Sequence, residues 1–117
     1  MFKVIIAGGR DFSDYSLLRE KSLFFLQKKM PNVIIVSGHA SGADLLGEQF
    51  ANEYGFQTII KPADWQKYGR SAGPKRNTEM AEISDALIAF WDGKSRGTKN
   101  MIDTARQKKL VVRIINY

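Results

Sequence analysis

The sequence predicts an α/β fold in which a five-stranded parallel sheet carries helices on both faces. Two observations support this prediction. Short apolar, β-branched runs recur along the chain, and segments with the periodicity of amphipathic helices separate them. Strands that alternate with helices form right-handed βαβ units and therefore a parallel sheet. The chain has no internal repeat and no linker-like tract, so we expect residues 1–117 to form one domain.

The first strand is expected over Phe2–Ala7, an almost wholly apolar run that suits the centre of a sheet. A helix should follow, capped by Ser13 or Asp14 and ended by Pro31. Its apolar stripe is predicted from two pairs of residues seven positions apart: Leu17, Leu18, Phe24 and Phe25.

The second strand is predicted over Val33–Ser37 and its helix over Ala43–Tyr54, with Gly55 as the residue that ends the helix. Gly47 lies on the apolar face of this helix, so we expect the helix to approach the sheet closely. The other residues of that face are Ala43, Leu46, Phe50, Ala51 and Tyr54. A third, shorter strand is expected over Phe56–Ile60.

The segment Ala63–Pro74 is the least regular part of the chain and predicts a loop with one helical turn. Pro74 suits the first turn of a helix that runs to Ser84 and buries Met80 and Ile83. Ala86–Trp91 is the fourth predicted strand.

The polar turn Asp92–Gly97 follows the fourth strand. Thr98 is expected to cap a helix that runs to Lys108, and Leu110–Ile115 is the last predicted strand. The inward-facing residues of the helix are Met101, Ile102 and Ala105.

The expected strand order is 3-2-1-4-5, with the first strand at the centre. In such a sheet the ligand lies beyond the carboxyl ends of the strands, where the strand order reverses. The turns after the first, second and fourth strands should therefore open onto one crevice. Their N–H groups, and those of the helix N-termini that follow, suit a phosphate. The predicted ligand-binding residues are Gly8, Gly9, Arg10, Asp11, Ser37, Gly38, Ser41, Gly42, Asp44, Trp65, Arg76, Asn77, Asp92, Ser95, Gly97 and Thr98.

Several of these residues admit two interpretations. Trp65 and its neighbour Tyr68 are placed to stack on a base or, equally, to pack over the end of the sheet. Asp44 either accepts hydrogen bonds from ribose hydroxyls or complements a helix dipole. His39 is the only histidine; it is an acid–base candidate near neutral pH, although a lone loop histidine is more often incidental.

The composition excludes several functional classes. The chain has no cysteine and one histidine, so neither a thiolate nucleophile nor a zinc site can form, and we expect no metal and no cofactor. It contains no Gly-x-x-x-x-Gly-Lys-Ser/Thr motif of a P-loop ATPase. It also lacks the Gly-x-Gly-x-x-Gly of a dinucleotide dehydrogenase after the first two strands. No apolar run approaches the about 20 residues of a membrane span, and no signal peptide is evident, so we expect a cytoplasmic protein.

The net charge of +6 is unevenly distributed, because residues 61–117 hold twelve Lys and Arg against six Asp and Glu. A basic excess fits nucleic acid, a phosphorylated ligand or a plain basic surface.

Five segments in order resemble the YspA-like family, a cpYpsA-related branch of the SLOG superfamily that is frequent in bacteria and phages. They are Gly8–Phe12, Ser37–Asp44, Ala63–Trp65, Ala72–Met80 and Phe90–Thr98. The resemblance implies a Rossmann-like three-layer sandwich. It also implies a nucleotide-derived ligand such as a nucleotide sugar or an ADP-ribose-like molecule.

This chain departs from the family pattern at two positions. His39 stands where Gly is expected, and Ser41 stands where Arg is expected. Arg10 or Arg76 would have to supply the charge that position 41 lacks.

A more distant resemblance connects the chain to LOG-type, lysine decarboxylase-like enzymes, which are nucleoside-monophosphate phosphoribohydrolases. The matching residues are Arg76, Met80, Ser84–Ala86 and Gly97-Thr98. In those enzymes acidic residues follow Gly-Thr and serve catalysis, whereas Lys99 and Asn100 follow here.

Three functions follow from these observations. The first is a sensor or processing module that binds a nucleotide-derived small molecule, its phosphate on the turns at 37–42 and 93–98. The second is a hydrolase acting on an N-glycosidic or phosphate bond, with Asp44, Arg76 and Glu79 as candidate catalytic residues and Asp11 and Asp92 as further carboxylates. The third is a single-stranded DNA-binding module, ranked last because the basic residues are scattered in sequence. A homodimer is also expected.

Overall fold

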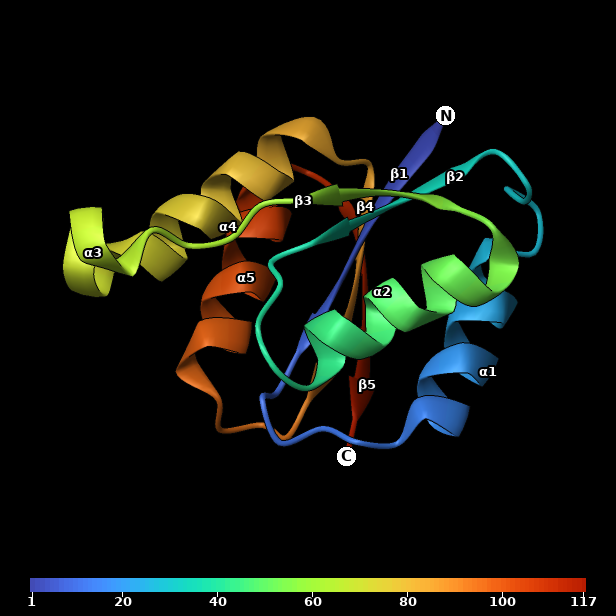
Figure 1. The fold of residues 1–117 in the computed structure, drawn as a ribbon, viewed down its shortest axis with the longest axis horizontal. Helices are drawn as coiled ribbons and strands as arrows, with labels where there is room; N and C mark the ends of the chain where they lie inside the picture. The colour runs from blue at the N-terminus through green and yellow to red at the C-terminus, as the bar shows by residue number, and fades with distance from the viewer.

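The computed structural model describes residues 1–117 and contains one five-stranded parallel sheet of order β3-β2-β1-β4-β5, as predicted. The strands are β1 (Phe2–Gly8), β2 (Val33–Ser37), β3 (Gln57–Ile60), β4 (Ala86–Trp91) and β5 (Val111–Asn116). The helices are α1 (Tyr15–Leu26), α2 (Ala43–Tyr54), α3 (Trp65–Tyr68), the 3-10 turn η1 (Gly69–Ser71), α4 (Ala72–Ile83) and α5 (Arg96–Gln107). The sheet lies between α1 and α2 on one face and α4 and α5 on the other (Figure 1).

The central strand β1 is apolar because both of its faces are covered. Val4 pairs with Ile35 of β2 on one side and with Ala86 of β4 on the other. Alternate residues of β1 then enter two separate cores. Ile6 contributes to the core beneath α1 and α2, whereas Ile5 contributes to the core beneath α4 and α5.

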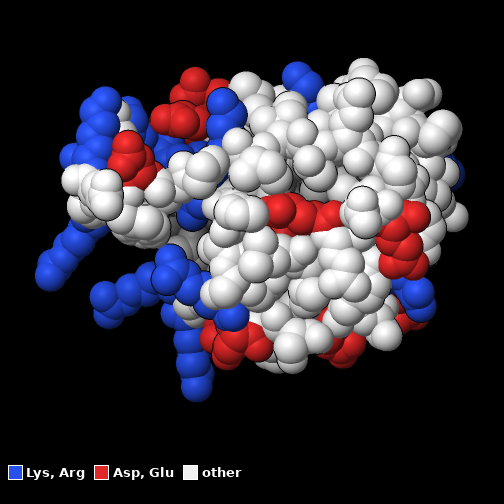
Figure 2. Space-filling model, in the orientation of Figure 1, with Lys and Arg blue, Asp and Glu red and all other residues white.

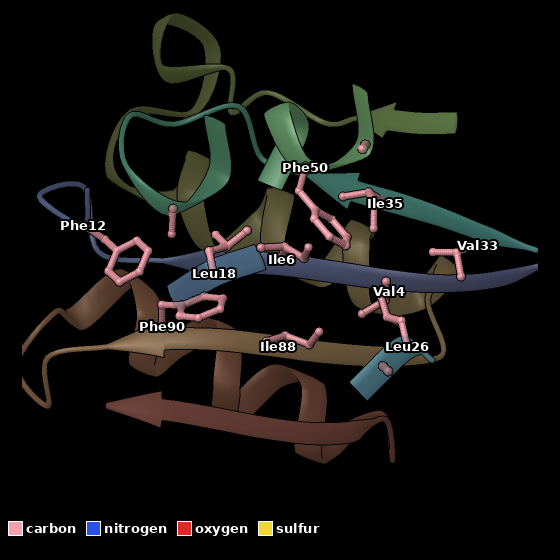
Figure 3. Packing of buried hydrophobic residues seen from close by; sticks show 13 residues of the cluster. Val4, Ile6, Phe12, Leu18, Leu26, Val33, Ile35, Phe50, Ile88 and Phe90 are labelled. Carbon is pink, nitrogen blue, oxygen red and sulfur yellow. The ribbon is translucent and has the colours of Figure 1, made fainter. Parts of the chain in front are cut away.

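The core beneath α1 and α2 is the larger of the two (Figure 3). Phe50 of α2 and Leu18 of α1 are fully buried there. Gly47 brings α2 close to the sheet as predicted, because a Cβ at this position would lie 2.9 Å from Ile6. The close approach of α2 to the sheet at this point therefore requires that position 47 carry no side chain.

The predicted apolar stripe of α1 is wrong at Phe24, which is 64% exposed. Asp14 caps the helix as predicted, accepting from the N–H of Leu17 at 3.0 Å. From this start, the face at i, i+4 and i+8 that meets the sheet is Leu18, Ser22 and Leu26. The helix ends at Leu26, before Pro31.

Helix α4 begins at Ala72, which places Pro74 in its first turn as predicted. One helix start differs from the prediction. Helix α5 begins at Arg96 with Ser95 as its cap, so Thr98 lies inside the first turn. Ser95 is the N-cap because its hydroxyl accepts a hydrogen bond from the N–H of Thr98, three residues ahead. No helix has both the length and the apolar character that crossing a membrane requires.

Candidate functional site

The carboxyl ends of β1 and β4 open onto one cleft of about 580 Å³, which is lined on its other sides by α4, the N-terminal half of α5, Trp65 of α3 and Arg70 of η1. A smaller hollow beyond the carboxyl end of β2 adjoins it. Of the predicted ligand-binding residues, twelve line the cleft: Gly8, Gly9, Arg10, Asp11, Asp44, Trp65, Arg76, Asn77, Asp92, Ser95, Gly97 and Thr98. Gly38 and Ser41 line the smaller hollow, whereas Ser37 and Gly42 line neither.

The turn after β1 is crowded against two other parts of the chain. A side chain at Gly8 would strike the carbonyl of Phe90, and one at Gly9 would strike the hydroxyl of Tyr117. That hydroxyl donates to the carboxylate of Asp11 at 2.6 Å. The contact fixes Asp11 at the rim and leaves Arg10 as the free cation of this turn.

The turn after β2 depends on a glycine that no other residue can replace without strain. Gly42 has φ +81°, and a Cβ there would collide with the carbonyl oxygens of Gly9 and Arg10. The first N–H of α2, from Ala43, donates to the Gly9 carbonyl at 3.2 Å. The turns after β1 and β2 are therefore docked directly on each other.

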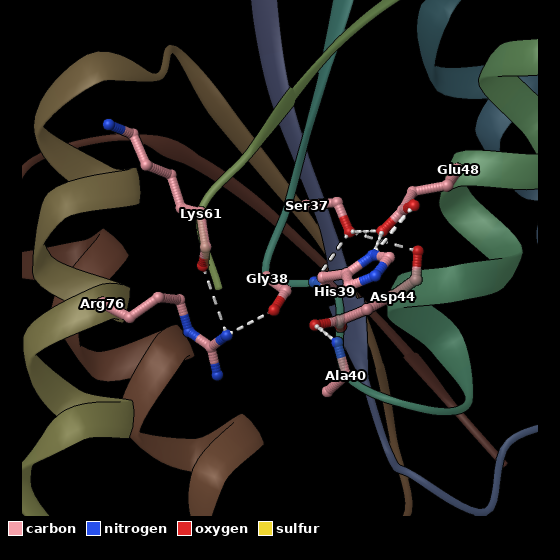
Figure 4. Close-up of polar contacts among 8 residues, drawn as sticks. All are labelled: Ser37, Gly38, His39, Ala40, Asp44, Glu48, Lys61 and Arg76. Atoms are coloured by element: carbon pink, nitrogen blue, oxygen red, sulfur yellow. Dashed lines mark hydrogen bonds and ion pairs between the residues drawn. The ribbon is translucent and has the colours of Figure 1, made fainter. Parts of the chain in front are cut away.

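Glu48 of α2 organises the start of the same turn (Figure 4). Its carboxylate accepts from the Ser37 hydroxyl at 2.7 Å and pairs with His39 Nδ1 at 2.8 Å. Ser37 is fully buried, so the structure commits this hydroxyl to the protein rather than to a ligand. His39 has φ +60°, a backbone conformation that glycine adopts most readily; its side chain is half exposed and faces the smaller hollow.

Arg76 of α4 reaches across to the ends of β2 and β3 (Figure 4). Its Nη1 donates to the Gly38 carbonyl at 2.6 Å and to the Lys61 carbonyl at 3.5 Å. A Cβ at Gly38 would lie 2.5 Å from this Nη1, so the glycine makes room for the guanidinium. No ion pair joins Arg76 to a carboxylate, and its Nη2 is left for a ligand.

Asp44, in the first turn of α2, is buried beside this arginine. Its Oδ2 accepts from the N–H of Ala40 at 3.2 Å. Burial raises the pKa of Asp44 to about 6, against the lowering effect of that hydrogen bond and of Arg76. Burial also lowers the pKa of Arg76, an effect that the Asp44 carboxylate opposes and the like charge of Arg10 reinforces. The cleft is thus lined by a carboxyl whose pKa is raised toward neutrality and which interacts with the charges of Arg10 and Arg76.

The turn after β4 satisfies most of its own polar groups. The Asp92 carboxylate accepts from the N–H groups of Lys94 and Ser95, both at 2.8 Å, and these bonds lower the pKa of Asp92. Ser95 caps α5 through Thr98. Two N–H groups that we expected to bind phosphate on the 93–98 turn are therefore occupied by Asp92.

Helix α4 supplies a polar wall to the cleft. Buried Asn77 accepts from Arg76 Nε at 3.0 Å and donates to Asn100 at 2.9 Å. Glu79, two residues further along, is exposed and lines neither hollow, so the structure separates this candidate catalytic residue from the site. Asp11 and Asp92 also lie at the cleft, but each is engaged by the hydrogen bonds described above.

Aromatic residues mark the outer edge of the cleft. Trp65 is 49% exposed, its ring lies against Gly73, and the Arg10 guanidinium stands 5.8 Å from its centroid. Tyr68 lies outside both hollows, beneath the ammonium groups of Lys67 and Lys75. Only Trp65 is placed to stack on a ligand.

Sequence reasoning missed two arginines and the residues that hold the turns. Arg70 and Arg96 line the cleft together with Arg10 and Arg76, so four cations scattered in sequence converge in space. Basic side chains surround the side of the molecule on which α3 lies (Figure 2). Arg96 lies beside Gly97 in the predicted polar turn, so the reasoning that selected Gly97 as a ligand-binding residue could also have selected Arg96. Glu48 and Tyr117 act through tertiary contacts that no local pattern signals.

Comparison with known proteins places this geometry among related folds. The chain resembles DNA processing protein A (DprA) from Streptococcus pneumoniae with a TM-score of 0.76 and 21% identity, over 100% of this chain and 51% of that one. It resembles the protein TM1055 with a TM-score of 0.69 and 22% identity, over 96% of this chain and 72% of that one. At such identities the likeness shows the fold alone, and the chain spans about half the length of the DprA chain.

Two sequence comparisons go further. The Gene 61 protein of Mycobacterium phage D29 is 30% identical over 123 residues, which covers 100% of this chain and 97% of that protein. The sequence model of the YspA, cpYpsA-related SLOG family matches residues 2–68. The chain belongs to the YspA, cpYpsA-related SLOG family.

Proposed function

We propose that the protein binds a nucleotide-derived, phosphate-containing small molecule in the cleft at the carboxyl edge of the sheet, as a sensor or processing module. The observation that carries this proposal is the pair Arg10 and Arg76. Both guanidinium groups face the cleft, and neither pairs with a carboxylate. Arg76 is partly buried and Arg10 is exposed, and guanidinium groups that no carboxylate occupies are strong, geometrically specific partners for phosphate.

Other features support the same ligand class. The cleft has room for a nucleoside, since small-molecule sites are commonly about 300–1,000 Å³ and this one is about 580 Å³. Met80 and Met101 line its floor and Trp65 its edge, which suits the faces of a base. Nucleotides, nucleotide sugars and ADP-ribose-like molecules all combine these parts.

Isothermal titration calorimetry with nucleoside monophosphates, NAD and ADP-ribose tests the proposal. We expect Arg76→Gln to weaken the binding of the best ligand by about 10- to 100-fold, the effect of one charge-assisted contact. Because Arg76 also holds the Gly38 carbonyl, Arg10→Gln serves as a second variant that removes no hydrogen bond of the protein. The control is Arg19→Gln on α1, where the arginine pairs with Glu53 away from the cleft. Absence of binding to every compound would refute the proposal.

A hydrolase acting on such a ligand is the alternative, and Asp44 favours it. Proton transfer is most efficient from a group whose pKa lies near the working pH, and Asp44 lines the cleft with a pKa raised to about 6. Release of free base or phosphate from a nucleotide panel, followed by chromatography, tests this function. Activity that Asp44→Asn abolishes and Asp103→Asn on α5 retains would support it; intact substrates after long incubation would exclude it.

Single-stranded DNA is a further alternative, supported by the exposed Trp65 with Arg10 over its ring and by the likeness in fold to a protein described as DNA-processing. Stacking on aromatic residues combined with a cationic groove is typical of such binding. Fluorescence anisotropy with a labelled oligonucleotide should then show steeply salt-dependent binding. No change at low salt would dismiss it.

A further inference from the structure

The imidazole of His39 is held in one orientation by a closed set of hydrogen bonds (Figure 4). Its Nδ1 lies 2.8 Å from the Glu48 carboxylate, and its backbone N–H donates to the Ser37 hydroxyl at 3.1 Å. That hydroxyl in turn donates to Glu48 at 2.7 Å. An ionised carboxylate only accepts hydrogen bonds, so the neutral imidazole carries its proton on Nδ1. All hydrogen bonds of the ring are made by Nδ1, which leaves the lone pair of Nε2 free to react.

The backbone of the β2 turn supports this orientation. His39 has φ +60°, a left-handed conformation that is uncommon for a residue with a Cβ. Such a conformation persists only where surrounding contacts hold it, and the contacts with Ser37 and Glu48 do so. The Glu48 side chain is only 21% exposed, so water screens its charge incompletely. A carboxylate behind one ring nitrogen orients a histidine for chemistry at the other nitrogen.

The arginine pair joins the hollow that contains His39 to the cleft that contains Asp44. Arg10 and Arg76 line both spaces, whereas His39 lines only the smaller hollow and Asp44 lines only the cleft. Asp44 lies beside Arg76, because a Cβ at Gly38 would be 2.5 Å from Arg76 Nη1 and 2.8 Å from Asp44 Oδ2. A phosphoryl group bound by the arginines is therefore within reach of two different groups, one from each space. Phosphoryl transfer uses such an arrangement, since the attacking and leaving atoms lie in line across phosphorus.

The carboxyl of Asp44 suits the departing side of this reaction. Burial raises the pKa of Asp44 to about 6, so a sizeable fraction of the protein carries this proton in mildly acidic solution. The negative charge of a bound phosphate favours the protonated form further. Once protonated, Asp44 no longer offsets the charges of Arg10 and Arg76, and it has a proton to donate to a departing oxygen.

We propose that the protein is a phosphomonoesterase in which His39 is the nucleophile, Glu48 its positioning residue and Asp44 the general acid. Nε2 attacks the phosphorus of a terminal phosphate held by Arg10 and Arg76, and the N–P bond forms as the P–O bond breaks. The leaving oxygen takes the electron pair of the P–O bond and the proton of Asp44. Water then attacks the phosphohistidine and gives a proton to the Asp44 carboxylate, and the electron pair of the N–P bond returns to Nε2. In the intermediate, Glu48 offsets the positive charge of the substituted ring.

The substrates are phosphate monoesters, nucleoside monophosphates among them. Nε2 must reach phosphorus through the smaller hollow, and a second substituent on the phosphate would occupy that space. This inference rests on the anion site of the proposed function and goes beyond it, because it assigns a reaction, a covalent intermediate and a role for His39.

Release of inorganic phosphate from AMP, UMP and p-nitrophenyl phosphate tests the reaction. We expect His39→Gly to lower kcat by at least about 1,000-fold, as the loss of a nucleophile does. Added imidazole, which fits the space left by the side chain, should restore turnover. Glu48→Gln should lower kcat by at least about 10-fold with little change in KM. Glu82→Gln is its matched control on the exposed side of α4, outside both spaces, and should change neither constant.

The intermediate is tested with Asp44→Asn, which cannot activate water. The nitrophenolate of p-nitrophenyl phosphate leaves without a proton, so this variant should give a stoichiometric burst of nitrophenol and then stall. Peptide mass spectrometry should find an acid-labile phosphoryl group on His39. Circular dichroism verifies that each variant is folded. Glycine suits φ +60°, and His39→Asn, which also tolerates this conformation, is the second variant at that position.

The outcomes separate the two claims. If monophosphates bind but are not hydrolysed, if His39→Gly keeps wild-type activity or is not rescued by imidazole, or if no phosphohistidine forms, the inference is wrong and the nucleotide site stands. If p-nitrophenyl phosphate reacts through phosphohistidine but no nucleotide binds, the inference holds and the proposed function fails. If nothing binds and nothing is hydrolysed, both fail.

Discussion

The turn after β2 and the turn after β4 lie at the same edge of the sheet but are held in different ways. Local contacts dominate the β4 turn: Asp92 binds the N–H groups of Lys94 and Ser95, and Ser95 caps the helix that follows. The β2 turn is held by groups from elsewhere, namely Glu48 of α2, Arg76 of α4 and the carbonyl of Gly9.

This difference separates a turn that maintains its own shape from one whose shape depends on the assembled fold. In the β4 turn, the N–H groups of Lys94 and Ser95 donate to the Asp92 carboxylate. Fewer N–H groups of this turn therefore remain for a ligand. The β2 turn instead places Gly38 and Ser41 beside the cations Arg10 and Arg76. We therefore expect the β2 side of the site, more than the β4 side, to decide which anion binds.

The largest expected effect concerns the glycines of the two turns. Gly42→Ala forces a Cβ against two carbonyl oxygens at φ +81°, and we expect it to lower the free energy of unfolding by about 3–4 kcal/mol. Gly93→Ala in the β4 turn has a similar φ of +83° but open space around it, so its cost should be about 1 kcal/mol. Urea unfolding measures both, and equal costs would contradict the tight docking of the β2 turn on Gly9.

A smaller, pH-dependent effect is expected for Asp44→Asn. The pKa of Asp44 in the folded protein is raised from 3.8 to about 6, so the native state binds the proton more tightly than the unfolded state. The stability contributed by this group is present below pH 4 and is lost as the pH rises through 6. The asparagine variant should therefore match the wild type near pH 4 and exceed it by about 2–3 kcal/mol near pH 7.5.

Urea unfolding of both proteins at these two pH values checks the prediction. A variant that is less stable than the wild type at pH 7.5 would show that the Asp44 carboxylate is stabilised by its neighbours rather than penalised by burial.

A third effect concerns the turn after β1, which the C-terminal tyrosine supports. Tyr117→Phe removes the hydrogen bond to Asp11 and should lower the free energy of unfolding by about 1 kcal/mol, since the group is partly exposed. The ring still packs edge-on against Phe12, with 4.8 Å between centroids. Without the tyrosine hydroxyl, the Asp11 carboxylate is free to turn toward the cleft, where its negative charge repels a phosphate. Nucleotide binding should therefore weaken as well. Unchanged binding would show that the hydrogen bond from Tyr117 to Asp11 does not affect the ligand site.

The smallest effect is expected for Asp92→Ala in the self-contained turn. Asp92 is partly exposed to solvent and its partners can bond to water, so the melting temperature should fall less than in Gly42→Ala. The lowered pKa of Asp92 means that its contribution is present at neutral pH and is lost as the pH falls through the lowered value. Differential scanning fluorimetry between pH 7 and pH 2.5 checks this, and a loss as large as that of Gly42→Ala would reverse the comparison of the two turns.

The same comparison explains how much of the molecule the sequence could predict. The strand Val33–Ser37 and the helix Ala43–Tyr54 have the predicted bounds because glycines and an apolar period mark them locally. The strand order followed from connectivity. The buried role of Ser37 could not be predicted, because its partner Glu48 is not marked by any local pattern.

The cation cluster was predicted only in part for the same reason. Arg10 and Arg76 follow or precede recognisable turns, whereas Arg70 reaches the cleft from an irregular segment whose path depends on packing. Phe24 was misassigned because pairs of apolar residues seven apart fix a stripe without fixing which side of it meets the sheet.

The binding of an anion between Arg10 and Arg76 is tested most directly by a ¹⁵N-resolved NMR titration of the protein with ADP-ribose. We predict large chemical-shift changes at the amides of Arg10, Gly38 and Ser41 and at the side-chain Nε–H of Arg76. The amides of Lys94 and Ser95, already bound by Asp92, should shift little, and those of Phe2 and Val111 at the opposite edge should not shift. A spectrum that stays unchanged, or changes confined to that opposite edge, would contradict the account.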